Sequence, residues 1–146
     1  MNDLIKIKDK LVSQLYENKC LPIASESIED SIITLTLDSC YPLFITIDED
    51  EIVVIYANEH DNFIRKSCKS DDEWIRSACW LVSLLSSCII VFCFVHAKSI
   101  LIDYEIMVKR QDGKMELLKR VVVSSNPFLR FYKKQKTIQE IAFYRK

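Results

Sequence analysis

The spacing of hydrophobic residues predicts a helix at the start of the chain and strands over much of the remainder. In residues 3–18, Leu4, Ile7, Leu11 and Leu15 lie three or four positions apart, as on one face of an amphipathic helix. Alternation of hydrophobic with polar residues is typical of half-buried strands. This alternation predicts strands over residues 32–37 and 99–110. Hydrophobic runs on either side of the acidic residues 48–51 predict strands over 43–47 and 52–57, and the Asp-Gly pair at 112–113 predicts that residues 115–123 form a strand paired with 99–110.

A second helix is predicted over residues 71–87. Ser70 and Glu73 have the spacing of a capping box, in which a serine and a glutamate three residues later satisfy backbone N–H groups at a helix start. Hydrophobic residues surround most of the axis of this segment, so we expect it to be buried on more than one side. Trp74 and Trp80 should then contribute much of the core.

Residues 77–97 carry no charged side chain and are long enough to span a bilayer. Two features favour a different structure. Ser83, Ser86 and Ser87 interrupt the segment, and the β-branched and aromatic run at 89–95 is typical of a buried strand. We therefore expect a buried helix followed directly by a strand, with a membrane span as the alternative that the sequence leaves open.

The remaining segments predict connections. The acidic residues 48–51 and the Asp-Gly pair at 112–113 are typical of tight hairpin turns. Residues 19–31 and 58–69 are polar and lack alternation, so we expect connectors there. The capping-box spacing at 137–140 predicts a short final helix.

The predicted strands before the helix at 71–87 are joined by short turns, and so are those after it. Short turns imply antiparallel pairing. The expected fold class is therefore α+β, with a mainly antiparallel sheet of five to six strands, an N-terminal helix and a buried central helix at about residues 71–87. The length, and the lack of a segment long enough to be a linker, predict a single domain over residues 1–146.

The composition excludes one large group of functions. The chain has a single glycine, Gly113. Loops that bind phosphate groups through their backbone need several glycines, because only glycine lets the backbone approach the ligand closely. A P-loop, a dinucleotide-binding fingerprint and a kinase-type glycine-rich loop are all excluded.

The cysteines and histidines form no recognisable reactive or metal-binding pattern. No two of the six cysteines have Cys-x-x-Cys spacing, and neither histidine lies near such a pair, so we expect no metal and no cofactor. Cys93 and His96 are three residues apart in a predicted strand and should point to opposite faces. A cysteine of the first half could meet His60 in space, but we expect buried thiols and no enzyme activity.

Charge is distributed unevenly along the chain. Residues 1–73 contain 16 acidic and 7 basic side chains, and residues 74–146 contain 5 acidic and 13 basic ones. This asymmetry predicts an acidic surface and a basic surface, and therefore a charged partner. The alternative is that the two halves interleave in one sheet and neutralise each other.

The strongest candidate for a binding surface is acidic. Its residues are Asp48, Glu49, Asp50, Glu51, Glu59 and Asp61. Carboxylates on an exposed turn would speed association with a basic protein and orient it, more than they would add affinity. The tail from residue 128 mixes aromatic residues with six cations, a weak signature of nucleic-acid binding. We expect amphipathic packing there, and neither nucleic acid, membrane nor small-molecule substrate as a partner.

In size, layout and the exposed acidic segments 26–30, 48–51 and 59–61, the chain resembles the small immunity proteins of bacterial toxin systems, including contact-dependent growth inhibition. The resemblance covers the whole chain and includes no diagnostic motif. It implies a stoichiometric inhibitor whose acidic surface covers a basic face of the cognate toxin. The polar, charged N-terminus shows no secretory signal, so we expect a cytoplasmic location.

A second resemblance is to type III secretion chaperones, which are also small and often acidic. The predicted order of a helix, three strands, a helix, further strands and a short helix is similar to theirs. The basic second half and the length of chain after residue 99 depart from that family. This resemblance implies binding of an extended client segment.

Overall fold

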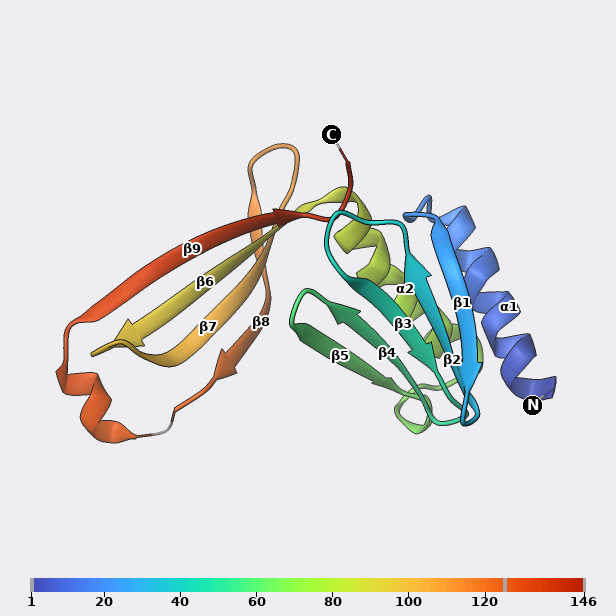
Figure 1. Cartoon of the computed structure of the whole chain (residues 1–146), viewed down its shortest axis with the longest axis horizontal. Coiled ribbons are helices and arrows are strands. Elements are labelled where there is room, and N and C mark those ends of the chain that lie inside the picture. The colour runs from blue at the N-terminus through green and yellow to red at the C-terminus, as the bar shows by residue number, and fades with distance from the viewer. Residues whose placement is uncertain (1, 125, 146) are drawn as a thin grey trace. The chain divides into compact units, whose positions relative to one another are not determined.

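The computed structural model describes residues 2–124 and 126–145 (Figure 1). The chain divides into two compact units. Unit 1 consists of Met1–Ser87 together with Phe143–Lys146, and unit 2 consists of Cys88–Ala142. In sequence, unit 2 is therefore an insertion into unit 1.

Unit 1 combines helices with an antiparallel sheet. Its elements are α1 (Asn2–Glu17), β1 (Ile23–Glu29), β2 (Ile32–Leu37), β3 (Leu43–Ile47), β4 (Glu51–Tyr56), β5 (Glu59–Ile64), the 3-10 helix η1 (Arg65–Ser67) and α2 (Asp71–Ser87). The five strands lie side by side in the order in which they follow along the chain. Each strand therefore pairs with its neighbour in sequence, as short turns dictate.

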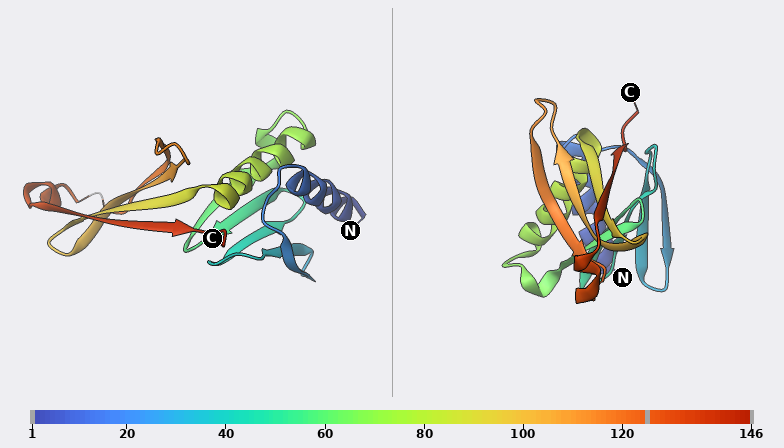
Figure 2. Two further views of the ribbon diagram at one scale, coloured as in Figure 1. Left: turned by 90° about the horizontal axis from the view of Figure 1, so that it is seen from above. Right: turned by 90° about the vertical axis from the view of Figure 1, so that its left-hand side faces the viewer.

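Helices α1 and α2 cover the same face of this sheet (Figure 2). Alternation along β2, β3 and β4 turns every second side chain toward the helices, where it is buried. The hydrophobic stripe of α1 predicted from the sequence faces the same core. The buried side chains of the strands and of α1 are Ile33, Leu35, Leu37, Leu43, Ile45, Ile47, Ile52, Val54, Tyr56, Leu4, Ile7, Leu11 and Leu15.

The two helices run parallel to each other. The thiol of Cys79 in α2 donates to the carbonyl oxygen of Leu11 in α1, with a distance of 3.8 Å. About two turns further along α2, Ser86 Oγ accepts a hydrogen bond from the backbone N–H of Leu21 at 3.0 Å. The end of α1 and the segment after it are thereby fixed against the last turn of α2.

The predicted helix over residues 71–87 is confirmed, and its predicted cap is formed. Ser70 Oγ accepts a hydrogen bond from the backbone N–H of Glu73 at 3.2 Å. The Glu73 carboxylate in turn accepts one from the backbone N–H of Lys69. The N–H of Glu73, which the first turn leaves without a helical partner, is thus satisfied, and so is the N–H of Lys69 just before the cap.

Of the two tryptophans expected in the core, only Trp74 lies there. It is fully buried, and its Nε1 donates to the carbonyl oxygen of Phe63 at 2.7 Å. The prediction for Trp80 is wrong, because its side chain is 54% exposed. Trp80 lies with Arg76 and Ser87, both exposed, on the side of α2 that faces neither the sheet nor α1.

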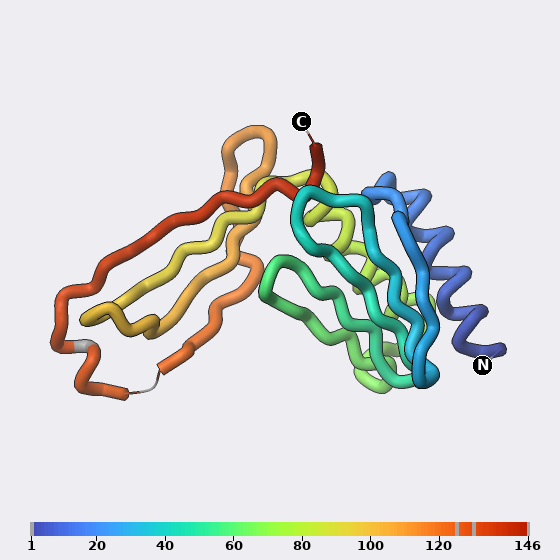
Figure 3. Tube along the Cα trace, viewed as in Figure 1, coloured from blue at the N-terminus to red at the C-terminus, as the bar shows by residue number. Residues whose placement is uncertain are grey.

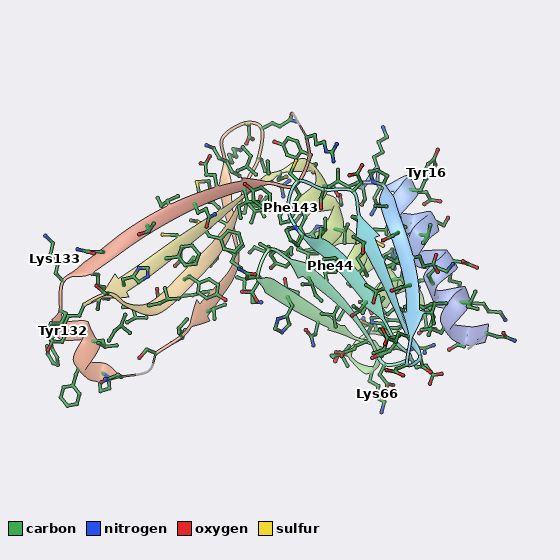
Figure 4. All side chains as sticks on the ribbon, viewed as in Figure 1. Tyr16, Phe44, Lys66, Tyr132, Lys133 and Phe143 are labelled. Atoms are coloured by element: carbon green, nitrogen blue, oxygen red, sulfur yellow. The ribbon has the colours of Figure 1, made fainter. Side chains whose placement is uncertain are left out.

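The C-terminal segment belongs to unit 1 (Figure 3). Phe143 is fully buried and packs edge to face against Tyr41, with ring centroids 6.1 Å apart (Figure 4). Its carbonyl oxygen accepts a hydrogen bond from the backbone N–H of Cys40 at 2.9 Å. Arg145 adds an ion pair with Asp38 at 3.2 Å. The end of the chain is thus fixed along the connection between β2 and β3.

Unit 2 is built around a second antiparallel sheet. Its elements are β6 (Ile89–Ala97), β7 (Ile100–Lys109), β8 (Met115–Val122), the 3-10 helix η2 (Pro127–Phe131) and β9 (Lys134–Ala142), and the four strands lie in the order β8-β7-β6-β9. The described residues of this unit include no α-helix. At one end of the sheet, Leu129 of η2 packs with Ala97, Ile102 and Val95 in a small cluster.

The structure confirms the α+β class, antiparallel pairing, the N-terminal helix and the buried central helix. The strands are divided between a sheet of five and a sheet of four, where the sequence predicts one sheet of five to six. The run over residues 77–97 is divided between α2 and β6, and no helix of the described residues is long and apolar enough to cross a membrane. That the whole chain is a single domain stays a prediction.

Three local predictions are wrong, and each concerns a strand at the edge of a sheet. Residues 19–31 contain β1, residues 58–69 contain β5, and the predicted final helix at 137–140 lies within β9. Edge strands are half exposed and tolerate polar side chains on both faces, so they lack the alternation by which strands are recognised. In β9, the threonine and glutamate that resemble a capping box are both exposed strand residues.

Phe143→Ala should strongly destabilise unit 1, because it leaves a cavity where a fully buried ring packs against Tyr41. We expect a loss of about 3–5 kcal/mol in the free energy of unfolding. Urea unfolding followed by tryptophan fluorescence measures this directly, since Trp74 and Trp80 both lie in unit 1. Phe131→Ala, which truncates an exposed ring, should change it by less than about 0.5 kcal/mol. Equal effects of the two substitutions would contradict the placement of Phe143.

Candidate functional site

The antiparallel order of unit 1 gathers acidic residues at one end of its sheet. When strands follow one another antiparallel, their first and third turns lie at the same end, and the pairing of Ile33 with Ile47 places these two turns on adjacent hairpins. Both turns are seen at the lower end of the sheet in Figure 1. We call this surface the acidic end; its residues are Glu29, Asp30, Asp48, Glu49, Asp50 and Glu51.

Asp48 shapes the turn between β3 and β4. Its Oδ1 accepts hydrogen bonds from the backbone N–H groups of Asp50 and Glu51 at 2.7 and 2.8 Å. Asp48 is therefore needed for the turn itself, as aspartates in such turns often are. Glu49 and Asp50 at the tip are exposed. Their side chains make no hydrogen bond or ion pair within the described part of the chain.

Arg65 fixes this turn to helix α2. Its Nη1 donates to the carbonyl oxygen of Glu49 at 2.9 Å, and its backbone N–H donates to that of Asp50 at 2.9 Å. Its Nε and Nη2 donate to the two carboxylate oxygens of Asp71 at 2.9 and 2.8 Å. The guanidinium also lies over the ring of Trp74, 5.2 Å from its centroid. One cation thus holds a turn, a helix start and a core side chain together.

The same contacts determine the protonation of the pair. The hydrogen bonds from Arg65 lower the pKa of Asp71, although desolvation opposes this shift. The hydrogen bonds to Asp71 raise the pKa of Arg65, again against desolvation. Both groups are therefore charged at neutral pH. The charge of Arg65 is used in this ion pair, so it does not cancel that of the exposed carboxylates at the tip.

The turn between β1 and β2 brings two further acids to the acidic end. Asp30 and Ser31 both have positive φ, of 51° and 62°, as in the two-residue turns that match the twist of a hairpin. Glu29 and Asp30 are exposed. The sequence predicts a connector here, because residues 19–31 are polar and lack the alternation of a half-buried strand.

Two of the residues chosen from the sequence lie elsewhere. Glu59 pairs with Tyr56 across the far end of the β4–β5 hairpin, and only 7% of its surface is exposed. Its Oε1 accepts a hydrogen bond from the backbone N–H of His60 at 3.0 Å. Asp61 lies further along β5, where its Oδ2 accepts one from Tyr56 Oη at 2.8 Å. The structure therefore brings Asp48–Glu51 together but separates Glu59 and Asp61 from them.

The sequence marks residues 26–30 as an exposed acidic segment but does not group Glu29 and Asp30 with residues 48–51, and it does not reveal the role of Arg65. Glu29 and Asp30 could have been found by the rule that first and third turns share an end, had β1 been recognised. Nothing in the sequence singles out Arg65 among its polar neighbours, since its role depends on contacts with a turn and a helix that are distant along the chain.

The charge asymmetry of the sequence follows the two units. Unit 1 contains 16 acidic and 10 basic side chains, whereas unit 2 contains 5 acidic and 10 basic ones. Each sheet is built entirely from strands of its own unit. The alternative that acidic and basic strands interleave in one sheet is therefore wrong.

The thiols with resolved pKa shifts are poor nucleophiles. Burial raises the pKa of Cys79 to about 12, and burial also raises that of Cys20. Cys93 and His96 both lie in β6, where their spacing places them on opposite faces. Over residues 2–124 and 126–145, no group of three or more histidines, cysteines or acids could hold a metal ion.

No protein-family model matches the chain, and no curated protein or solved structure matches it. The resemblance to immunity proteins therefore depends on the layout of the chain and its acidic segments alone.

Asp71→Asn should reduce stability at pH 7 but not in acid. Because the pKa of Asp71 lies below its ordinary value of 3.8, its bond to Arg65 stabilises the fold fully above that value. This contribution is lost as the pH falls through the lowered pKa. Since both side chains are partly exposed, we expect less than about 1 kcal/mol at pH 7.

Urea unfolding of the wild type and of Asp71→Asn at several pH values measures this difference, which should shrink as the pH falls below 3.8. Asp30→Asn, at an exposed turn, is the matched control. A difference between wild type and Asp71→Asn that stays constant down to low pH would show that the ion pair contributes nothing.

Proposed function

We propose that this chain is a non-catalytic protein-binding domain of the cytoplasm that neutralises a bacterial toxin by binding and covering it, as an immunity protein does. The observation that carries this proposal is the acidic end of unit 1, where exposed carboxylates from two hairpin turns lie on one surface. The expected partner is a toxin domain with a basic face. The resemblance in size and acidic segments supports the same function.

The way these carboxylates are held suits recognition of a folded partner. Hydrogen bonds that Asp48 accepts and that Arg65 donates fix the backbone of the β3–β4 turn, so little conformational freedom remains to be lost on binding. The tips, Glu49 and Asp50, remain in water. Exposed charges of one sign speed diffusional encounter with a partner of opposite sign and orient it.

The same exposure argues for binding over acid–base chemistry. A catalytic carboxyl pair needs a site shielded from water, in which the two pKa values are driven apart. Glu49 and Asp50 lie on a turn in open solvent. Charge–charge attraction to a partner needs no such shielding.

Growth rescue tests the function itself. Genes of immunity proteins lie directly beside that of their toxin, so the product of the larger neighbouring gene should arrest growth when expressed alone. Co-expression of this chain should restore growth, and the purified proteins should form a one-to-one complex on size exclusion. Arrest that co-expression leaves unchanged, or a neighbouring product without toxicity, would contradict the proposal.

Charge reversal tests the surface. Glu49→Lys should lower the association rate with the toxin by about tenfold at low salt and flatten its salt dependence, since the steering charge is reversed. Glu17→Lys makes the same change in charge at an exposed position near the end of α1 and is the matched control. Stopped-flow mixing at several ionic strengths measures both rates. Equal rates for the two variants would exclude the acidic end from the interface.

A further inference from the structure

A second charged surface lies at one end of unit 2. The turn between β6 and β7, the 3-10 helix η2 and the start of β9 meet there, since Ala97 pairs with both Ile100 and Lys134. Figure 4 shows Tyr132 and Lys133 at this end of the sheet. We call this surface the aromatic–basic tip; its residues are Phe128, Phe131, Tyr132, Lys98, Lys133 and Lys134.

Two phenylalanines of the tip are held out in water. Phe128 is 71% exposed and Phe131 is 85% exposed, although both belong to a defined 3-10 helix. Asn126 caps this helix by accepting a hydrogen bond from the backbone N–H of Phe128 at 3.0 Å, and Leu129 anchors it in the small cluster of unit 2. The rings therefore protrude because the backbone is fixed that way. Exposed rings of this size are unfavourable unless something covers them.

Three lysines lie at the same end of the sheet. Lys98 lies over the ring of Tyr132, with its Nζ 4.0 Å from the centroid, and Lys133 and Lys134 follow directly in the chain. The nearest acids along the chain have other partners. Asp103 pairs with Arg120 at 3.0 Å, and Glu140 pairs with Lys109 at 3.4 Å. Among the residues that the structure describes, Lys98, Lys133 and Lys134 form no ion pair, so the tip presents uncompensated positive charge and its natural partner is anionic.

A polar cavity of about 330 Å³ adjoins the tip. Its lining includes Lys134, the polar side chains of Ser124 and Asn126, and also Arg120 and Asp103, whose charges cancel in their ion pair. A site of this kind can accept one negatively charged group. It lies beside the apolar rings, so a partner must offer anionic groups and an apolar region together.

We propose that the aromatic–basic tip docks unit 2 onto an anionic lipid bilayer. Phenylalanine rings insert at the boundary between headgroups and acyl chains, and lysines contact anionic headgroups. Docking of this kind needs no membrane-spanning helix, and it goes beyond the proposed binding of a toxin. Together the protruding rings, the uncompensated lysines and the polar cavity match the layered chemistry of a bilayer surface.

Single-stranded nucleic acid is the other anionic partner, and the geometry disfavours it. Such chains are bound in grooves that follow the phosphate backbone, with bases stacked on open aromatic faces. Here the face of Tyr132 toward Lys98 is already covered, and the phenylalanines lie on a protruding turn. The experiment below separates the two partners.

Sedimentation with vesicles tests the proposal on the purified full chain. We expect binding to vesicles of about two parts phosphatidylcholine to one part phosphatidylserine, and binding weaker by tenfold or more to phosphatidylcholine alone. Phe128→Ala and Phe131→Ala should each lower the partition coefficient by about tenfold. Lys133→Gln should lower it by about fivefold, since a lysine near an anionic surface contributes about that factor.

Two matched controls lie at the opposite end of the same sheet. Leu117→Ala removes an apolar side chain that is 59% exposed, and Lys114→Gln removes an exposed charge in the β7–β8 turn. Both should leave vesicle binding within about twofold of the wild type. Circular dichroism checks that each variant is folded. We expect all of them to fold, because every substituted side chain is exposed.

The outcomes decide the proposal. Binding that requires phosphatidylserine and is lost in the phenylalanine variants but not in the controls supports it. Absence of vesicle binding, or equal losses in tip and control variants, overturns it. Binding of a single-stranded oligonucleotide in a parallel titration, without vesicle binding, would assign the tip to nucleic acid and overturn it as well.

Discussion

Burial of one face of the five-stranded sheet beneath two parallel helices is the constraint on which unit 1 depends. Because α1 and α2 cover the same face, β2, β3 and β4 must each direct alternate side chains toward them. A shift of one residue in any of these three strands would turn its buried side chains to the opposite face. The register is therefore fixed by the core, and with it the end of the sheet at which each turn lies. The acidic end follows from this register, because no contact between carboxylates would bring them together.

The division of charge also follows from pairing between sequence neighbours. Each strand of unit 1 pairs with the strand next to it in sequence, and no strand of one sheet pairs with the other sheet. An acidic segment of sequence thus remains an acidic region in space, and the same holds for the basic segment. At physiological salt the Debye length is about 8 Å, so a bound partner responds mainly to the charges nearest to it.

Sequence reasoning predicted the elements that the core determines and missed those it does not. The hydrophobic stripe of α1, the alternation in β2 and β7 and the hydrophobic runs of β3 and β4 all reflect burial, and all were predicted, as was the cap of α2. The strands β1, β5 and β9 lie at sheet edges with mostly polar, exposed residues, so no periodic signal marks them. Among the edge strands, β8 was found because the Asp112-Gly113 turn marks its start.

The same distinction applies to the candidate site. Asp48, Glu49, Asp50 and Glu51 were predicted because a run of acids between two hydrophobic segments indicates a turn. The separation of Glu59 from them could not be predicted, because it depends on which end of a hairpin each residue occupies. Its burial depends on the face that β5 turns toward the helices. Residues that are close in sequence can therefore lie at opposite ends of a sheet whose strands follow one another antiparallel.

The residues on these surfaces do not all carry the same information about function. Asp48 shapes a turn and Asp71 pairs with Arg65, so both would be retained by a protein with no partner at all. Glu49 and Phe131 make no such contribution, and they cost the isolated chain free energy through repulsion between like charges or through exposure of an apolar ring. Features that a fold does not need, and that oppose its stability, persist where binding offsets their cost. The exposed acids of the turns and the exposed rings of η2 are thus the positions at which partners should be sought.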